Sequence, residues 1–278
     1  MKNSAQAAEK SDLPTRFAVG VVLIGIAVVV TYMGGLPFRV LAAAAAAMML
    51  LEWADMHRVR RFWTWLAILL LVVPLIAVAQ YLYPAQDSNP AALFPDMIER
   101  SWQGFAAVGA LGVLLAIFSL RPRMGWGFIY VGVPAFALIV LNWAWAELVL
   151  WAFIVTWSTD IFAYFAGRSI GGAKLAPRTS PNKTWSGLVG GMVGAGVAAA
   201  VAGHLLQVDP VFHYLGAPFG LLAQLGDLYE SSVKRRLGVK DSGHILPGHG
   251  GVLDRLDGLL PVALATFAVL AALSLDRL

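Results

Sequence analysis

The sequence predicts an all-α, polytopic membrane protein: a helical bundle of about nine transmembrane helices. Hydrophobic residues make up 59% of its 278 residues and charged residues 13%, whereas roughly 45 to 50% of a soluble domain is apolar. Several apolar stretches reach the roughly 20 residues that cross a bilayer, and the charged residues fall between them. A soluble globular protein is therefore excluded. The absence of cysteine also excludes disulfides, thiolate metal sites and cysteine nucleophiles.

Windows of about 19 residues place the expected spans along the chain. Five lie in the first half: Phe17 to Met33, Leu36 to Trp53, Phe62 to Tyr83, Phe105 to Leu120 and Gly127 to Asn142. Four follow in the second half: Leu148 to Ala166, Gly187 to Leu206, Phe212 to Tyr229 and Leu256 to Leu275. The seventh span is rich in glycine, which favours close packing against another helix.

The distribution of Lys and Arg orients this bundle, because basic residues collect on the cytoplasmic side of membrane proteins. With the N-terminus in the cytoplasm, nine spans leave only three of the 20 basic residues outside: Arg39, Arg100 and Arg277. We therefore expect a cytoplasmic N-terminus and a C-terminus on the periplasmic, outer side. The expected location is the inner (plasma) membrane of the cell.

The two halves of the chain differ in polarity. Residues 1–145 are apolar with short connections, and they are interpreted as an N-terminal transmembrane scaffold. Residues 146–278 contain two long loops on the expected cytoplasmic side, Arg168 to Ser186 and Glu230 to Asp257. These loops are rich in glycine, proline and polar side chains that could take part in catalysis. The second half is therefore the predicted catalytic region.

The two clearest cases of an acidic residue inside a predicted span are Asp160 in the sixth span and Asp227 in the eighth. Ionisable groups are costly in hydrocarbon and therefore indicate function. On a helix, one polar face would carry Asp227, Glu230, Ser231 and Lys234. An alternative stays open for both acids: they pair with basic residues and only hold helices together.

The loop after the eighth span combines glycines with acids. Gly243, Gly248, Gly250 and Gly251 leave backbone N–H groups free to approach an anion. Asp254 and Asp257 follow and are placed to face Asp227, where the acids would clamp one divalent metal ion or two. The loop is neither a P-loop nor a zinc-binding helix motif. His249 admits two interpretations, a catalyst and a structural hydrogen-bonding residue.

The other long loop offers cations and hydroxyl groups before a predicted helix. The cations are Lys174, Arg178 and Lys183, and the hydroxyls are those of Thr179, Ser180 and Thr184. One interpretation is an anion cradle, because a helix N-terminus offers unpaired N–H groups. The other is contact with anionic lipid head groups. Composition alone does not separate the two.

The stretch Ser231 to Asp257 resembles the signature of the phosphatidate cytidylyltransferase family. It reads Ser231-x-Val233-Lys234-Arg235, then Lys240-Asp241-x-Gly243, then Leu246-Pro247-x-His249-Gly250-Gly251-Val252-x-Asp254-Arg255-Leu256-Asp257. Two further blocks are similar to the same family: Asp160-x-x-Ala163-Tyr164-x-x-Gly167 and Ser180-Pro181-x-Lys183-Thr184-Trp185. Two positions depart from the family pattern, Asn182 in place of the common lysine and Ser186 in place of the common glutamate.

The resemblance implies a CTP-dependent nucleotidyltransferase of phospholipid biosynthesis. The implied reaction converts CTP and phosphatidate, a membrane lipid, to CDP-diacylglycerol and pyrophosphate. The resemblance also implies Mg²⁺, with K⁺ as a companion ion, and a homodimer of multi-span subunits. No nucleic acid is expected among the partners. By position, the residues that match the metal ligands of the family are Asp227 and Asp254.

The implied reaction suggests roles for the other polar residues of these blocks. Asp257 and Asp241 are further candidates for the metal, and Asp160 would orient the loop or add to the metal site. Lys234 and Lys240 are predicted catalytic residues that would stabilise phosphates, as would Arg235 and Arg255. Residues expected to border the CTP or head-group site are Ser180, Lys183, Thr184, His249, Gly250 and Gly251.

Two other classes of protein compete with this interpretation. A transporter would also carry acids inside spans, but its polar residues should cross the bilayer, whereas here they gather at one face. A lipid-alcohol kinase or a CDP-alcohol phosphotransferase would also act at this face. The phosphotransferase, however, expects a dense aspartate array on two neighbouring helices, which this sequence lacks.

Overall fold

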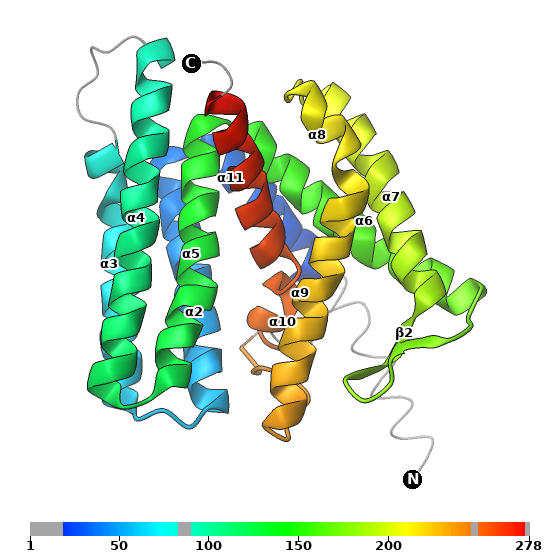
Figure 1. Ribbon diagram of the computed structural model, residues 1–278, viewed down its shortest axis with the longest axis horizontal. Coiled ribbons are helices and arrows are strands. Elements are labelled where there is room, and N and C mark those ends of the chain that lie inside the picture. Colours follow the sequence, from blue (N-terminus) through cyan, green and yellow to red (C-terminus); the bar gives the residue numbers. More distant parts are fainter. Residues whose placement is uncertain (1–18, 83–89, 246–249, 276–278) are drawn as a thin grey trace.

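The computed structural model of the chain describes residues 19–82, 90–245 and 250–275. Helices dominate the described chain (Figure 1), so the expected all-α class is confirmed for the bundle. After an N-terminal helix, Val19–Met33, the elements are α2 (Gly35–Met56), α3 (Arg61–Leu82), α4 (Pro90–Ser119), α5 (Pro122–Ala144), α6 (Ala146–Ser169), β1 (Lys174–Ala176), β2 (Ser180–Thr184), α7 (Trp185–Leu205), α8 (Pro210–Tyr214), α9 (Gly216–Arg236), α10 (Leu253–Leu256) and α11 (Leu259–Leu275).

The loop after α6 departs from the all-α expectation, because it forms a small antiparallel hairpin. Lys174 of β1 pairs with Thr184 of β2, and Ala176 pairs with Ser180. The Thr179 N–H donates to the Ala176 carbonyl at 3.1 Å and closes the turn. Pro177 precedes Arg178 in this turn, at the position where the fixed φ of proline is favoured. The hairpin gives the predicted anion-binding loop a defined shape.

Several helices have the length and composition to cross a membrane. Five qualify on both counts, namely α2, α5, α6, α7 and residues Met97–Ser119 of α4. Three shorter apolar helices accompany them, Val19–Met33, Arg61–Ala77 and Leu259–Ser274. The predicted eighth span corresponds to α8 and α9. The second half of α9 is polar, so α9 belongs neither to the five candidate spans nor to the three shorter apolar helices. The chain is thus a multi-pass helical membrane protein, and the count of nine spans stays a prediction.

The outward faces of these helices suit hydrocarbon. On α7, exposed apolar side chains recur every four residues: Val189, Val193, Val197, Val201 and Leu205. Such a stripe would be costly in water, whereas α-helices satisfy their backbone groups internally and can present apolar side chains to lipid. The opposite side of α7 packs on α6, where the indole N–H of Trp151 donates to the Ala199 carbonyl at 3.2 Å.

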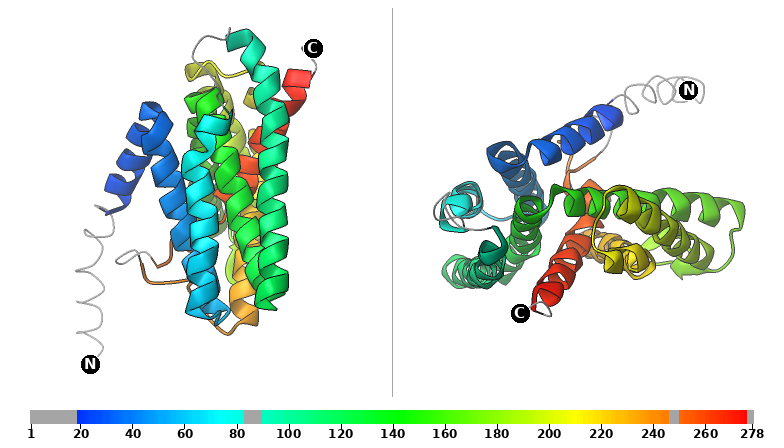
Figure 2. Two further views of the ribbon diagram at one scale, coloured as in Figure 1. Left: turned by 90° about the vertical axis from the view of Figure 1, so that its left-hand side faces the viewer. Right: turned by 90° about the horizontal axis from the view of Figure 1, so that it is seen from above.

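Figure 2 shows how the helices are grouped when the bundle is seen from above. The helices α2 to α5 form one group and α6, α7 and α9 form a second, with α11 between them in contact with α4, α5, α6 and α9. The core includes the fully buried rings of Trp53, Phe128, Trp151 and Phe212. The last helix, α11, therefore lies between the two groups and packs against α9.

The basic connections meet at one end of the bundle. In Figure 1 the α2–α3 turn, the α4–α5 turn, the hairpin and the C-terminal end of α9 lie at the same end. Arg58 and Arg60 lie in the α2–α3 turn, Arg121 lies in the α4–α5 turn, and Arg123 lies in the first turn of α5. This gathering of basic residues is the arrangement that the positive-inside rule expects of a cytoplasmic face. The two polar loops of the second half lie at that end.

Candidate active site

Lys234 lies near the C-terminal end of α9 between two carboxylates. Its Nζ is 2.7 Å from Oε2 of Glu230, one helical turn earlier, and it contacts Oδ1 of Asp254 at the start of α10. Burial alone would lower the pKa of Lys234, but its contacts with these two carboxylates raise the pKa above its ordinary value. Lys234 is therefore a fixed positive charge, and two predicted site residues, Lys234 and Asp254, are brought together.

Asp254 holds the glycine-rich loop through its own carboxylate. The Gly251 N–H donates to Oδ2 at 2.9 Å, and the Ser242 N–H donates to the same oxygen at 3.0 Å. Burial would raise the pKa of Asp254, but Lys234 and these two N–H groups outweigh it and lower the pKa below its ordinary value. Gly250 adopts φ of 81°, which a side chain would strain, so glycine is required where the loop turns toward Asp254.

Asp227 lies on the same face of α9, two turns before Lys234, and it pairs with a different lysine. Its Oδ2 is 2.6 Å from Nζ of Lys183 on β2, and its Oδ1 accepts from the Ser231 hydroxyl at 3.1 Å. Lys183 also donates to the Gln224 carbonyl at 3.5 Å. The two long polar loops predicted from the sequence therefore meet at α9, because the hairpin delivers Lys183 to Asp227.

Asp257 and Asp160 add negative charge next to this site. Asp257 is buried between α10 and α11, where its Oδ1 accepts from the Gly258 N–H at 2.7 Å. The carboxylates of Asp227, Glu230 and Asp160 are close enough to repel that of Asp257. Asp160, exposed on α6, interacts electrostatically with Asp227, Lys183 and Arg255. Carboxylates from α6, from α9 and from the segment between α10 and α11 therefore repel one another.

The donor set suits a divalent metal ion that also binds substrate oxygens. Within the described ranges, no group of three or more His, Asp or Glu side chains has the geometry to hold a metal ion unaided. Mg²⁺ does not require one, since it is commonly held by one or two carboxylates and completed by phosphate oxygens and water. The buried Glu230 Oε1 has no hydrogen-bond partner, and the repulsion at Asp257 marks an excess of negative charge. The residues present therefore fit Mg²⁺.

The other predicted site residues lie around these pairs. Thr184 is buried, and its Oγ1 accepts from the Gly187 N–H at 3.0 Å, so it caps α7. Arg235 donates from Nε to the Thr179 carbonyl at 3.2 Å and fastens the hairpin to α9. Ser180 is half-buried at the start of β2, and His249 lies outside the described residues. Arg235 is exposed, as are Lys240, Asp241 and Arg255.

The comparison with protein families covers nearly the whole chain. Residues 14–273 match the model of a family described as "Cytidylyltransferase family". The matched range includes every described element that contributes to the two lysine–carboxylate pairs. The chain belongs to the cytidylyltransferase family.

Curated relatives in this family are similar over most of their length. The phosphatidate cytidylyltransferase of Brucella abortus biovar 1 (strain 9-941) is 37% identical over 276 residues, which covers 91% of each chain. The phosphatidate cytidylyltransferase of Bacillus subtilis (strain 168) is 33% identical over 279 residues, covering 95% of this chain and 99% of that protein. That of Rickettsia conorii is 40% identical over 165 residues, 54% of this chain and 70% of that protein.

Three of the side chains around the candidate site were not among the predicted residues. Glu230 was placed on the polar face of α9 but given no role. Gln224, also on α9, donates from Nε2 to the Leu188 carbonyl at 3.0 Å and ties α9 to α7. Glu52 of α2 accepts hydrogen bonds from the glycine-rich loop. Glu52 lies inside the predicted second span, so the cost of an ionisable group in a span was the signal that could have identified it.

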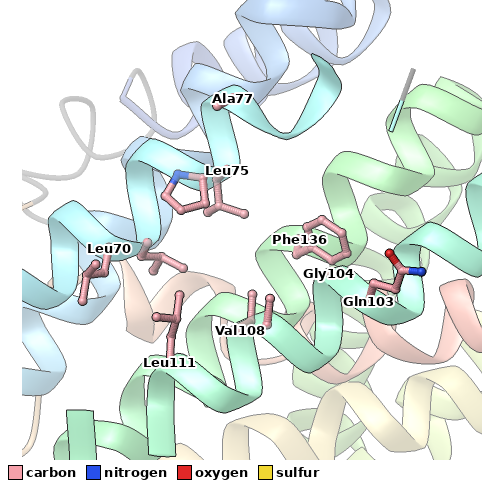
Figure 3. Close-up of a pocket in the computed structure, with 11 residues that line it drawn as sticks. Leu70, Leu75, Ala77, Gln103, Gly104, Val108, Leu111 and Phe136 are labelled. Atoms are coloured by element: carbon pink, nitrogen blue, oxygen red, sulfur yellow. The ribbon is translucent and has the colours of Figure 1, made fainter. Parts of the chain in front are cut away.

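Two apolar cavities differ in their relation to this site. One, of about 330 Å³, lies among α3, α4 and α5 (Figure 3) and is lined by Leu70, Leu75, Val108, Leu111 and Phe136 without a titratable group. The other, of about 350 Å³, lies among α5, α9 and α11 and reaches Gly226, Tyr229 and Pro261. Because Gly226 precedes Asp227, only the second cavity borders the candidate active site of this cytidylyltransferase-family chain.

Replacing Gly226 by Ala is expected to separate α9 from the start of α11. A Cβ at this position would collide with the Asp257 carbonyl and lie 2.9 Å from Pro261 Cγ. Overpacking of this kind costs about 1 to 3 kcal/mol, so the melting temperature should fall together with activity. Gly196→Ala on α7 is the control, since its nearest neighbour would be 3.7 Å away. Equal melting temperatures for the two variants would contradict the close α9–α11 contact.

Proposed function

We propose that this chain is a phosphatidate cytidylyltransferase, which converts CTP and phosphatidate to CDP-diacylglycerol and pyrophosphate in phospholipid synthesis. The observation that carries the proposal is the pair of lysine–carboxylate contacts on α9, Lys183 with Asp227 and Lys234 with Glu230 and Asp254. They lie at the end of an apolar helical bundle where its basic connections gather. Membership of the cytidylyltransferase family supports the same reaction.

The chemistry is a displacement at phosphorus. A phosphate oxygen of phosphatidate forms a bond to the α-phosphorus of CTP, the bond from that phosphorus to the α–β bridging oxygen breaks, and pyrophosphate leaves with the electron pair. The nucleophile is already an anion near neutral pH, so repulsion between anions is the main obstacle. Catalysis then depends on positioning and on positive charge near the phosphates. Lys183 and Lys234 supply fixed charge, and Lys240, Arg235 and Arg255 would hold phosphates.

The metal belongs to this proposal through the same carboxylates. Asp227, Asp254 and Asp257 would hold Mg²⁺, with K⁺ as a companion ion, and the metal would neutralise phosphate oxygens when bound. Asp254 accepts two backbone hydrogen bonds and Asp227 accepts one from Ser231, so both carboxylates are oriented before any ligand arrives. Asp160 and Asp241 would add negative charge at the edge of this site.

The location follows from the two substrates. CTP is polar and cannot enter hydrocarbon, whereas the acyl chains of phosphatidate cannot leave it, so the reaction requires a membrane boundary. We place that boundary at the cytoplasmic face of the inner membrane, with nine spans, a cytoplasmic N-terminus and homodimeric assembly. The apolar cavity beside Gly226 suits an acyl chain, because its lining of Leu222, Leu225 and Leu264 is apolar.

The decisive test of this function follows a radiolabel. Purified protein in detergent is incubated with phosphatidate, Mg²⁺ and CTP labelled on either the α- or the γ-phosphate, with an EDTA control. Transfer of the α-label to lipid, with release of the γ-label as pyrophosphate, is the expected result. Transfer of the γ-label to lipid would indicate a kinase instead. No lipid labelling by folded protein would refute the proposal.

Removal of Lys183 should impair this reaction more than removal of another cation nearby. In Lys183→Ala a charge-assisted bond from the lysine to a substrate phosphate would be lost, so kcat/KM for CTP should fall roughly 10- to 150-fold, equivalent to roughly 1.5 to 3 kcal/mol. Arg236→Ala removes an exposed charge from the last turn of α9 and should change kcat/KM little. Equal losses in the two variants would mean that only the overall charge of this face matters.

A further inference from the structure

Glu52 connects the N-terminal half of the chain to the glycine-rich loop. It lies in the last turns of α2, and its side chain is 2% exposed. Its Oε1 accepts from the Val252 N–H at 2.9 Å, and its Oε2 accepts from the Leu253 N–H at 2.8 Å and from the Ser242 hydroxyl at 3.1 Å. Ser242 and Val252 belong to the loop between α9 and α10, and Leu253 is the first residue of α10. A buried carboxylate of the scaffold therefore binds the predicted catalytic loop where it enters α10.

The contact requires two acceptor oxygens. A different backbone N–H, that of Val252 or Leu253, points at each oxygen of Glu52, and an N–H can only donate. A glutamine at this position would offer one acceptor and one NH₂ donor, which would leave one of these N–H groups without an acceptor. Since an unsatisfied buried donor is costly, the site is specific for a carboxylate.

The loop glycines are shaped around this carboxylate. A Cβ at Gly243 would lie 2.7 Å from Oε1 of Glu52, and one at Gly251 would lie 2.7 Å from Oε2. The sequence predicted that these glycines let backbone N–H groups approach an anion. In the structure the anions that they approach are carboxylates of the chain itself, Glu52 for Val252 and Asp254 for Gly251. The close approach therefore orders the loop.

Glu52 and Asp254 accept hydrogen bonds from the same two parts of the loop, at Ser242 and at Gly251–Val252. Ser242 donates its hydroxyl to Glu52 and its backbone N–H to Asp254. Gly251 donates to Asp254, and the next residue, Val252, donates to Glu52. A shift of the loop away from Glu52 would therefore also displace the groups that orient Asp254 and, through it, Lys234.

We propose that Glu52 is a positioning residue for nucleotidyl transfer: it fixes the loop that orients the Asp254 carboxylate. The effect of Glu52 on the reaction rests on the proposed function. The contact between Glu52 and the loop is tested independently of that function. Through this residue the first half of the chain sets the geometry of the catalytic region.

Glu52→Gln tests the proposal, with Asp55→Asn as its matched control. Asp55 lies three residues later on α2, also loses one negative charge on substitution, and pairs only at the surface, with Arg61 at 2.7 Å. In Glu52→Gln we expect kcat to fall about tenfold to a hundredfold while KM for CTP changes much less, because the loop is misplaced. Amide hydrogen exchange at Val252 and Leu253 should become roughly 5- to 150-fold faster. Asp55→Asn should alter neither quantity.

A second variant keeps the proposal testable if Glu52→Gln does not fold. Ser242→Ala removes one donor to Glu52 and should lower kcat in the same direction by a smaller factor. In the double variant the loss should be less than the product of the two single losses, since the hydroxyl has no carboxylate to bind. Normal kcat and normal exchange in Glu52→Gln, or in Ser242→Ala where only that variant folds, would overturn the proposal. If the wild type transfers no cytidylyl group, the proposed function fails, while exchange at Val252 and Leu253 still tests the contact.

Discussion

Asp254→Asn is expected to abolish nucleotidyl transfer and to loosen the loop after α9. Both carboxylate oxygens act as acceptors in the structure, Oδ1 for Lys234 and Oδ2 for the Gly251 and Ser242 N–H groups. An asparagine would place an NH₂ group against one of these donors, so the free energy of unfolding should fall by about 1 to 3 kcal/mol. Lys234 would keep only Glu230 as a partner, and its position next to the phosphates would change.

Activity in Asp254→Asn should fall by about a hundredfold or more, because charge stabilisation by a metal is worth several kcal/mol and each 1.4 kcal/mol is a factor of ten. Thermal unfolding and the label-transfer assay measure the two effects on the same preparation. The contact of Asp254 with Gly251 can be followed separately by amide exchange. Turnover near that of the wild type would remove Asp254 from the site, whatever its effect on stability.

Asp227→Asn is expected to remove activity with little change in stability. Asp227 is half-buried, and its two contacts, with Lys183 and Ser231, involve side chains at the edge of the site. Because a partly exposed ion pair is worth roughly 0 to 1 kcal/mol, its loss should barely move the melting temperature. The loss of a metal-binding charge should instead lower kcat/KM by about a hundredfold or more.

A double variant separates the metal role of Asp227 from simple pairing with Lys183. If Asp227 served only to hold Lys183, Asp227→Asn would be no more harmful than Lys183→Ala, and the double variant would match either single variant. We expect Asp227→Asn to be the more severe of the two and to lose the stimulation by Mg²⁺ that Lys183→Ala retains. An Asp227→Asn protein with normal activation by Mg²⁺ would contradict the assignment.

The order of the helices was predictable from the sequence, but their boundaries were less so. Hydropathy located α2, α5, α6 and α7 to within a few residues, since a long apolar window runs through each of them. It placed the start of the fourth span near Phe105, whereas α4 begins at Pro90. Polar residues such as Glu99 and Arg100 lower the hydropathy of that turn without preventing a helix. The hairpin β1–β2 was also unforeseen, because three and five residues carry too short a pattern.

The sequence predicted which residues share one helix face better than it predicted contacts between distant segments. Helical spacing correctly put Asp227, Glu230 and Lys234 on one face of α9. Spacing within one segment gives no information about contacts between distant segments, so the pair Lys183–Asp227 and the contact of Glu52 with Val252, 200 positions apart, were not predicted. The same limit applies to the loop glycines, because their pattern indicates an anion without saying that the anion is Glu52.

We propose that the carboxylates on α9 and beside α10 hold a divalent cation that neutralises the phosphates of CTP. Calorimetric titration of the detergent-solubilised protein with CTP, with and without Mg²⁺, tests it most directly when wild type and Asp227→Asn are compared. Mg²⁺ is expected to tighten CTP binding to the wild type and to have little effect on CTP binding to Asp227→Asn. Equal CTP affinity of the wild type with and without Mg²⁺, or full metal dependence in Asp227→Asn, would contradict it.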